Sequence, residues 1–379
     1  MSEIQIGGIN LTNEVYQCIG CGATIQTEDP EGLGYLPASA LAKGLVQESF
    51  YCQRCYRLRH YNELIDLALD EDLFLQRLSS IASDDAFVIL VVDVFDVEGS
   101  IISGIQRMIG EQPFAVAVNK FDLLPKVTRQ SKVKEWVRQI MNSNHLYPES
   151  VIITNGMKRS GIEALVELIE QYIHSKNIYI VGITNVGKST LINQLIQHYG
   201  GEREIITTSN HPGTTLDMIQ IPLTDDHSLI DTPGIIKKSQ YAHYLSRDEL
   251  KEVLPSKPLK PKTYQLKSEQ TLFLGGLARI DVKTQADKAA VTLYVNSSLY
   301  IHRTKTEKAS DFYEKHLGEL LNPPHQKEDF PELKAQSYRL SGKEDLNISG
   351  LGWITSNAPV NLTVWVPRGI AVTKRPSII

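Results

Sequence analysis

The sequence predicts three parts: an N-terminal zinc-finger module over residues 1–61, a doubly wound α/β domain with a mostly parallel sheet over 62–239, and a C-terminal α+β domain over 240–379. Two Cys-x-x-Cys pairs predict the first part, alternating strand and helix patterns the second, and short strands with alternating apolar residues the third. A length of 379 residues suits two or three domains.

The composition predicts a soluble, cytoplasmic protein. Hydrophobic residues make up 42% and charged residues 22% of the chain, as in globular proteins. The longest apolar run, Ala86 to Val92, is far shorter than the roughly 20 residues that span a bilayer. The N-terminus lacks a basic region followed by an apolar core, so no secretory signal is expected.

Charge is distributed unevenly along the chain. Residues 237–379 contain 22 basic and 15 acidic residues, a net charge of +7, whereas residues 1–236 carry −12. A basic C-terminal part favours an anionic partner such as RNA. A solvated lysine-rich surface is the alternative.

All four cysteines lie near the N-terminus, as Cys18-x-x-Cys21 and Cys52-x-x-Cys55. Two such pairs can place four thiolates around one metal ion, and zinc suits this ligand set. Iron or a redox pair would be the alternatives. Because four thiolates leave no open position for a substrate, the expected role is structural.

Basic and aromatic side chains interleave around the second cysteine pair. Such side chains stack on and pair with RNA, although the tyrosines would also serve simply to pack a small module. The residues are Arg54, Arg57, Arg59 and His60, with Tyr51, Tyr56 and Tyr61.

Secondary structure is predicted from apolar periodicity. Strands are expected at 86–94, 114–118, 151–154, 178–181, 217–223 and 227–230, and helices at 62–82, 101–108, 132–142, 162–173 and 188–198. This alternation is typical of a parallel sheet with covering helices. Prolines and lysines over 254–262 indicate a linker, followed by short strands such as 290–295 and 361–366 and a helix over 307–321.

A phosphate-binding loop is predicted from Gly182-x-x-x-x-Gly187-Lys188-Ser189, which follows a predicted strand and opens a predicted helix. Its backbone N–H groups would cradle phosphate, Lys188 would reach the β- and γ-phosphates, and Ser189 would bind Mg²⁺. The expected nucleotide contacts here are Gly182, Thr184, Asn185, Val186, Gly187, Lys188, Ser189 and Thr190.

Asp231-Thr-Pro-Gly234 follows another predicted strand. Asp231 would hold Mg²⁺ through water, and Gly234 would donate its backbone N–H to the γ-phosphate. Thr215 is the expected switch threonine over Mg²⁺, with Thr214 as the second choice. The expected catalytic residues are therefore Lys188, Thr215, Asp231 and Gly234, and the magnesium ligands are Ser189, Thr215 and Asp231.

Asn119-Lys120-x-Asp122 predicts selection of guanine. One carboxylate can accept hydrogen bonds from both N1–H and the exocyclic amine of guanine, a donor pair that adenine lacks, so Asp122 is the specificity residue. Asn119 would brace the loops, and Lys120 would lie over the ring. Asn155-Gly156 stands where GTPases usually carry Ser-Ala; a backbone N–H at Gly156 could still reach guanine O6.

The base-selecting motif precedes the phosphate loop, the reverse of the usual order. Together with the CxGCG…CxRC module at 18–55, this order resembles the YqeH family of circularly permuted GTPases. The resemblance implies GTP hydrolysis, with GTP/GDP, Mg²⁺ and Zn²⁺ bound, in assembly of the small (30S) ribosomal subunit. The implied partners are the 30S subunit or its precursor, through rRNA and/or ribosomal proteins; no membrane contact is expected, and the chain is expected to be a monomer.

Hydrolysis is expected to be slow, because Ile235 and Ile236 follow Gly234 where Ras-like enzymes carry a glutamine that orients water. Asn185 matches an asparagine that ligates K⁺ in related GTPases, and K⁺ would neutralise transition-state charge; alternatively, Asn185 only shapes the loop. A GTP-binding, RNA-binding scaffold with negligible hydrolysis is the competing function. In the reversed order, the chain runs from Gly234 almost directly into the C-terminal domain, so nucleotide state would reposition that domain.

Overall fold

The computed structural model describes residues 1–379 apart from 1–4, 7–8, 11–14, 31, 48, 62, 66–67, 70, 157–160, 200–217 and 329. The chain divides into two compact units. The first comprises Met1–Leu90, Gly104–Phe114 and Lys158–Ile235, and the second Val91–Ser103, Ala115–Met157 and Ile236–Ile379. Over the described ranges, no helix is both long and apolar enough to cross a bilayer.

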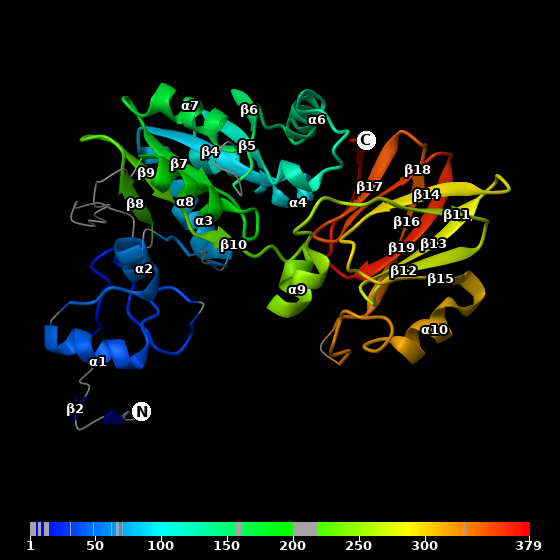
Figure 1. The fold of residues 1–379 in the computed structure, drawn as a ribbon, viewed down its shortest axis with the longest axis horizontal. Coiled ribbons are helices and arrows are strands. Elements are labelled where there is room, and N and C mark those ends of the chain that lie inside the picture. Colours follow the sequence, from blue (N-terminus) through cyan, green and yellow to red (C-terminus); the bar gives the residue numbers. More distant parts are fainter. Residues whose placement is uncertain are drawn as a thin grey trace. The chain divides into compact units, whose positions relative to one another are not determined.

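The N-terminal part of the first unit is small and contains little regular structure. Strands β1 (Gln5–Ile6) and β2 (Ile9–Asn10) form a short antiparallel pair. Two helices follow, α1 (Ala38–Gln47) and α2 (Gln53–Tyr61) (Figure 1). On α2, Arg54, Cys55 and Leu58 are buried, and their spacing places them along one face of the helix.

The described residues form a six-stranded sheet in the order β6–β5–β4–β7–β9–β8. The pairs β5–β6, β4–β7 and β7–β9 are parallel, and β8–β9 is antiparallel. This confirms the predicted mostly parallel sheet. All eight residues of β4 are buried, as expected for a strand covered on both faces. The strands are β4 (Ala86–Asp93), β5 (Phe114–Asn119), β6 (Ser150–Ile153), β7 (Asn177–Val181), β8 (Ile219–Pro222) and β9 (Ser228–Asp231).

Helices alternate with these strands along the chain. They are α3 (Glu71–Ser80), α4 (Val97–Ser100), α5 (Ile105–Ile109), α6 (Gln130–Ser143), α7 (Glu163–Tyr172) and α8 (Lys188–Tyr199). On α6, the apolar residues recur at helical spacing and are buried. These residues are Val133, Trp136, Val137, Ile140 and Met141.

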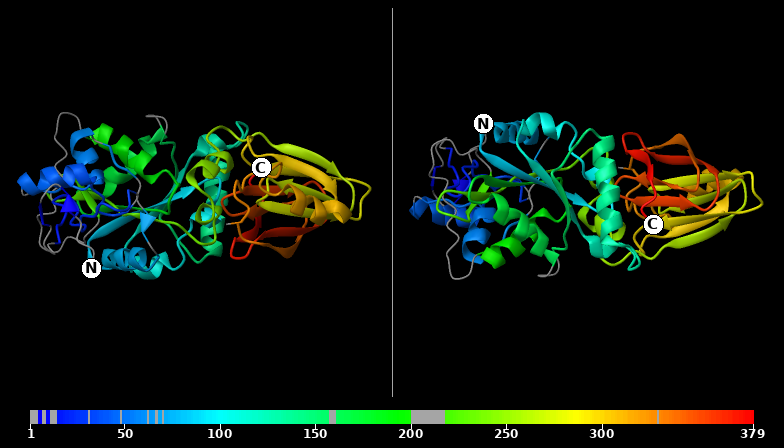
Figure 2. Two further views of the ribbon diagram at one scale, coloured as in Figure 1. Left: turned by 90° about the horizontal axis from the view of Figure 1, so that it is seen from below. Right: turned by 90° about the horizontal axis from the view of Figure 1, so that it is seen from above.

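The C-terminal part of the second unit contains two five-stranded antiparallel sheets, in the orders β11–β14–β18–β17–β20 and β15–β12–β13–β19–β16. Leu272 and Ile280 from one sheet share a buried cluster with Val291 and Ile354 from the other, so the sheets pack face to face (Figure 2). The elements are α9 (Arg247–Val253), β11 (Lys262–Leu266), β12 (Gln270–Leu274), β13 (Ala278–Thr284), β14 (Ala289–Tyr294), β15 (Ile301–Lys305), α10 (Ala309–His316), β16 (Leu333–Leu340), β17 (Glu344–Ile348), β18 (Gly352–Ser356), β19 (Val360–Pro367) and β20 (Val372–Pro376).

Three predicted helices differ from the structure. The helix expected over 62–82 begins only at Glu71, because the short strand β3 (Ala68–Leu69) pairs in parallel with β10 (Gly234–Ile235). The helix expected over 101–108 is replaced by α4 and α5, and Gly104 between them has a left-handed φ of 73°. The C-terminal helix is shorter than predicted, since it covers 309–316 rather than 307–321.

Candidate nucleotide and metal sites

The predicted phosphate loop connects β7 to α8 in the first unit. Asn185 and Gly187 have φ values of 65° and 83°, a left-handed backbone that glycine adopts freely and asparagine tolerates. Lys188 and Ser189 occupy the first turn of α8 and are buried. A helix that starts directly after such a loop provides a positive N-terminal end for phosphate.

Asp231 ends β9 beside this loop, because β9 pairs in parallel with β7 and Asp231 lies opposite Ile180. The Asp231 side chain is fully buried. Lys188 Nζ donates hydrogen bonds to the Asp231 carboxylate and to the Thr232 carbonyl. The hydroxyl of Ser189 and the carboxylate of Asp231 are oxygen ligands of the kind that Mg²⁺ prefers, so these two residues would hold the ion.

The loop after Asp231 packs directly on the phosphate loop. The Thr184 backbone N–H donates to the Ile235 carbonyl at 3.0 Å. A Cβ added at Gly234 would lie 3.2 Å from the backbone nitrogen of Thr184. The absence of a side chain at Gly234 therefore permits this close approach of the two loops.

Arg54, which the sequence analysis proposed for RNA contact and not for the nucleotide site, is buried and also reaches Asp231. Its Nη2 donates to Asp231 Oδ2, while Lys188 binds Oδ1. Burial disfavours the charged guanidinium, but the charges of Asp231 and the Cys55 thiolate raise the pKa of Arg54 above its usual value. The only signal in the sequence was an arginine inside a metal-binding motif.

The base-selecting motif lies in the second unit, at the end of β5. Asn119 is buried, and its Oδ1 accepts hydrogen bonds from the Gly156 backbone N–H at 3.2 Å and from Thr154 Oγ1 at 3.3 Å. Lys120 has a left-handed φ of 61°, and its Nζ donates to Asp93 Oδ2 at 2.7 Å. Asn119 thus braces the loop that contains Asn155 and Gly156.

The remaining predicted residues are placed as follows. Asp122 lies in a short 3₁₀ turn over Phe121–Leu123 and is half-buried. Thr190 is exposed on α8, and Gly182 and Val186 are buried. Thr214 and Thr215 lie outside the described residues, so the switch threonine stays a prediction.

The four cysteines form a compact buried cluster in which all Sγ atoms lie within 4.8 Å of one another. Cys21 Sγ and Cys52 Sγ are 3.8 Å apart, and the Cys52 backbone N–H donates to Cys18 Sγ at 3.2 Å. Neighbouring thiols and burial raise the pKa of Cys55, so four thiolates require a cation among them. The cluster fits a structural zinc ion, whose tetrahedral thiolate site is of this size.

The aromatic residues of α2 form part of an exposed surface. Tyr56 and Tyr61 are 46% and 67% exposed, so they do not pack the interior of the module. The rings of Tyr56 and His60 are tilted against each other with centroids 4.3 Å apart, and the Arg59 guanidinium lies 5.0 Å from the Tyr51 ring. This surface can stack on nucleic-acid bases.

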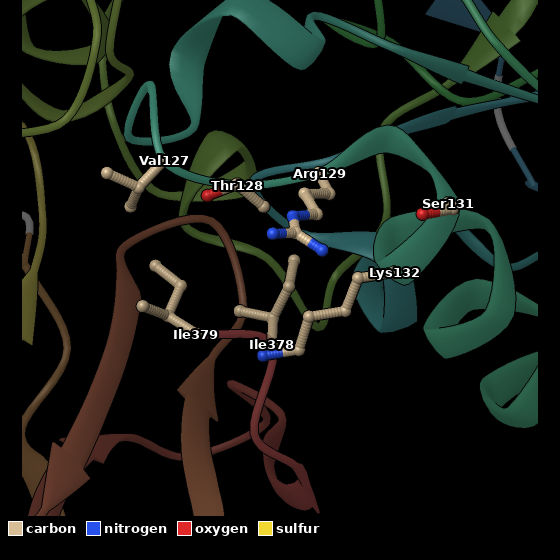
Figure 3. A pocket seen from close by; sticks show the side chains of 7 residues that line it. All are labelled: Val127, Thr128, Arg129, Ser131, Lys132, Ile378 and Ile379. Carbon is tan, nitrogen blue, oxygen red and sulfur yellow. The ribbon is translucent and has the colours of Figure 1, made fainter.

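A separate hollow of about 580 Å³ lies in the second unit (Figure 3). It is lined by Val127, Thr128, Arg129, Ser131, Lys132, Ile378 and Ile379. None of the predicted nucleotide-binding residues lines it, so it has no part in the nucleotide site.

Two family models match the chain. The model described as 50S ribosome-binding GTPase matches residues 177–263, and the model described as YqeH-like, C-terminal matches 288–378. The first match begins with β7, the strand before the phosphate loop, and leaves out the base-selecting motif at 119–122. This agrees with a rearranged order of the motifs.

Similar proteins extend over nearly the whole chain. The uncharacterized protein YqeH of Bacillus subtilis (strain 168) is 46% identical over 366 residues, covering 96% of this chain and 99% of that protein. The NO-associated protein 1, chloroplastic/mitochondrial, of Arabidopsis thaliana is 29% identical and covers 95% of this chain and 76% of that protein. GTPase Der of Xylella fastidiosa (strain 9a5c) is 29% identical over 43% of this chain and 36% of its own length.

The chain therefore carries a GTPase domain, which implies binding of GTP, GDP and Mg²⁺. Its likeness to the Bacillus protein includes both the cysteine module and the C-terminal sheets, because it covers 96% of the chain. On this full-length similarity and the reversed order of its motifs, the chain belongs to the YqeH family of circularly permuted GTPases.

Proposed function

We propose that this protein is a GTP-hydrolysing switch that acts in the cytoplasm on the small (30S) ribosomal subunit or its precursor. Its binding targets would be rRNA and/or ribosomal proteins. The observation that carries the switch is a set of buried contacts, all within the second unit, that joins the loop after β4 to the C-terminal sheets.

The first part of this connection is the segment that follows Gly234. Lys237 Nζ donates hydrogen bonds to the carbonyls of Gly99 at 2.9 Å and Ile101 at 2.8 Å. Two residues later, the Ser239 carbonyl accepts from the Ala371 backbone N–H at 3.0 Å. The segment that leaves the γ-phosphate sensor is therefore held by the loop after β4 and by the start of β20.

The second part is the buried carboxylate of Asp96. It accepts hydrogen bonds from five groups: one on its own loop, one on segment 236–243, one on strand β17 and two in the turn between β17 and β18. The donors are the Gly99 backbone N–H (3.1 Å), Gln240 Nε2 (3.0 Å), Asn347 Nδ2 (2.9 Å), Ser349 Oγ (2.7 Å) and the Gly350 backbone N–H (2.7 Å).

The start of the same loop contacts the base-selecting motif. Asp93, which ends β4, binds Lys120, and Asp96 follows three residues later. Nucleotide-dependent changes at Lys120 or at the segment after Gly234 would thus reach the C-terminal sheets through one loop. Such an arrangement suits a protein that presents a binding surface in one nucleotide state only.

Two surfaces support an RNA-containing partner. The exposed tyrosines of α2 form one. On the C-terminal part, His302 stacks on Phe312 with ring centroids 4.1 Å apart, and Phe312 lies 4.4 Å from the His316 ring. Rings beside the basic strand β15, together with the net charge of +7 over residues 237–379, favour stacking on bases and pairing with phosphates.

The experiment that tests the function is co-sedimentation with purified 30S subunits at physiological salt. We expect binding with a non-hydrolysable GTP analogue and its loss with GDP or without nucleotide. Purified 50S subunits and 30S precursor particles are run in parallel, since a GTPase family model matched by the chain is described as 50S ribosome-binding. Binding to 50S alone would contradict the proposal.

A scaffold that holds GTP but barely hydrolyses it is the second candidate. Its support is Ile235, which is buried and pairs with Leu69, so this position offers no polar group for an attacking water. A turnover assay with and without 30S subunits separates the two functions. Hydrolysis that stays undetectable in both conditions would favour the scaffold.

Potassium is expected to accelerate hydrolysis through Asn185. Asn185 lies in the phosphate loop, where its backbone has a left-handed φ of 65°. A monovalent cation bound by its side chain would offset charge that develops during phosphoryl transfer. We expect at least tenfold faster single-turnover hydrolysis in K⁺ than in Na⁺ at equal ionic strength, and no difference in Asn185→Ala. Equal rates in the two salts would contradict the assignment.

A further inference from the structure

The zinc module contributes a side chain to the phosphate end of the nucleotide site. Arg54 lies between Cys52 and Cys55, in the first turn of α2, and is only 4% exposed. Its guanidinium binds Asp231, 177 residues later in the chain. A long cationic side chain from a metal module is thus buried against the carboxylate predicted to hold Mg²⁺.

Arg54 and Lys188 share this carboxylate, one on each oxygen. The two cationic groups are therefore neighbours, and both lie at the end of the loop where Lys188 meets the β- and γ-phosphates. A guanidinium presents five N–H donors in a planar fork that matches phosphate oxygens. A γ-phosphate held by Lys188 would therefore lie close to the Arg54 side chain.

The backbone that carries Arg54 is fixed on both sides. Cys52 and Cys55 belong to the buried four-thiolate cluster, and Cys55 and Leu58 on the same helix are fully buried. A charged side chain whose backbone is fixed at the reacting centre needs little reorganisation during the reaction, which favours electrostatic catalysis. A zinc ion bound by the four cysteines would thereby anchor this arginine.

We propose that Arg54 is an arginine finger supplied in cis by the zinc module, which binds the γ-phosphate of GTP and stabilises the transition state of hydrolysis. In this step, the water oxygen bonds to the γ-phosphorus as the bond to the bridging oxygen breaks. The electron pair leaves with GDP, and the water proton passes to the phosphate released. The proposal rests on the GTP-hydrolysing function proposed above, and it also ties the position of the module to the nucleotide state.

The test compares Arg54→Ala and Arg54→Lys with Arg57→Ala. Arg57 lies on the same helix but is exposed and pairs with Glu63 at 2.5 Å, so it is a matched control. Zinc content and thermal unfolding are measured first for each variant. Equilibrium affinities follow for fluorescent GDP, for a non-hydrolysable GTP analogue and for GDP with aluminium fluoride, along with single-turnover GTP hydrolysis.

We expect Arg54→Ala to bind GDP within about threefold of the unaltered protein, and the GTP analogue at least tenfold more weakly. The aluminium fluoride complex should be lost, and hydrolysis should fall by roughly 10²- to 10³-fold, near the lower range for arginine fingers. Arg54→Lys should restore part of the analogue affinity. Arg57→Ala should match the unaltered protein throughout.

Two results would overturn the proposal. Unchanged analogue affinity would show that Arg54 does not meet the γ-phosphate, and tighter binding of GDP and analogue alike would show that it merely blocks the magnesium site. If Arg54→Ala loses zinc, the measurements are made on Arg54→Lys instead. Hydrolysis by Arg54→Lys as fast as by the unaltered protein would then refute the role of Arg54 as an arginine finger. If the unaltered protein does not hydrolyse GTP, the proposed function is refuted instead. The ratio of GDP affinity to GTP-analogue affinity in the variants still shows whether Arg54 binds the γ-phosphate.

Discussion

Alanine at Asp96 is expected to lower the free energy of unfolding by about 3–5 kcal/mol, because breaking a buried charged network by removing one member is strongly destabilising. Asp96 is 4% exposed, and its carboxylate accepts five hydrogen bonds. Without it, the donors of Asn347, Ser349 and Gly350 remain buried with one partner fewer. Urea denaturation measures this loss.

The variant should also uncouple nucleotide binding from the C-terminal sheets. In the unaltered protein, we expect the GTP analogue to protect segment 236–243 from proteolysis more than GDP does. In Asp96→Ala, that difference should disappear while affinity for GDP changes little. In Asp96→Asn, which keeps one acceptor oxygen, the difference in protection should lie between those of the unaltered protein and Asp96→Ala.

Asp281→Ala is the matched control. This aspartate also accepts several hydrogen bonds, from Thr271 Oγ1 at 2.6 Å, Arg279 Nε at 2.8 Å and Trp365 Nε1 at 2.9 Å, but all three partners lie on the C-terminal sheets. The Asp281→Ala variant should be less stable, but segment 236–243 should keep its nucleotide-dependent protection. A loss below about 1 kcal/mol in Asp96→Ala, or protection that persists, would contradict the role of Asp96 as a connection.

Local features of both the fold and the site could be predicted from the sequence. The phosphate loop is identified by residue types at fixed spacing, and the four cysteines by two short pairs, because such motifs need only a few neighbouring residues to form. Asn119 was expected to brace neighbouring loops, and the loop at Gly156 lies beside it because β5 and β6 are adjacent parallel strands whose carboxyl ends meet at one edge.

Contacts between distant parts of the chain could not be predicted in this way. Arg54 and Asp231 are 177 residues apart, and Asp96 and Ser349 are 253 apart, so nothing in the local pattern pairs them. The sequence predicts RNA contact for Arg54 from its charge, whereas its burial depends on how the cysteine module packs against Asp231. The same limit explains β3, where a tertiary strand pairing interrupts a helical pattern of apolar residues.

The specificity for guanine is expected to depend on Asp122. A carboxylate only accepts hydrogen bonds, and guanine offers two donors, N1–H and the exocyclic amine. Asparagine replaces one accepting oxygen with a donating amide, so one bond is lost and a donor faces a donor. Losing one charge-assisted bond and weakening the other costs roughly 3 kcal/mol. GTP affinity of Asp122→Asn should therefore fall by at least 100-fold.

Xanthine nucleotides should show the opposite change. Xanthine carries a carbonyl in place of the exocyclic amine of guanine, so the asparagine amide gains an acceptor that the aspartate lacked. Calorimetric titration with GTP, XTP and ATP measures the three affinities. The control is Asp225→Asn. Asp225 is exposed and lies between β8 and β9, so this variant makes the same chemical change away from the base-selecting motif. Unaltered GTP affinity in Asp122→Asn, or tighter binding of ATP than of XTP, would show that the base is read by other residues.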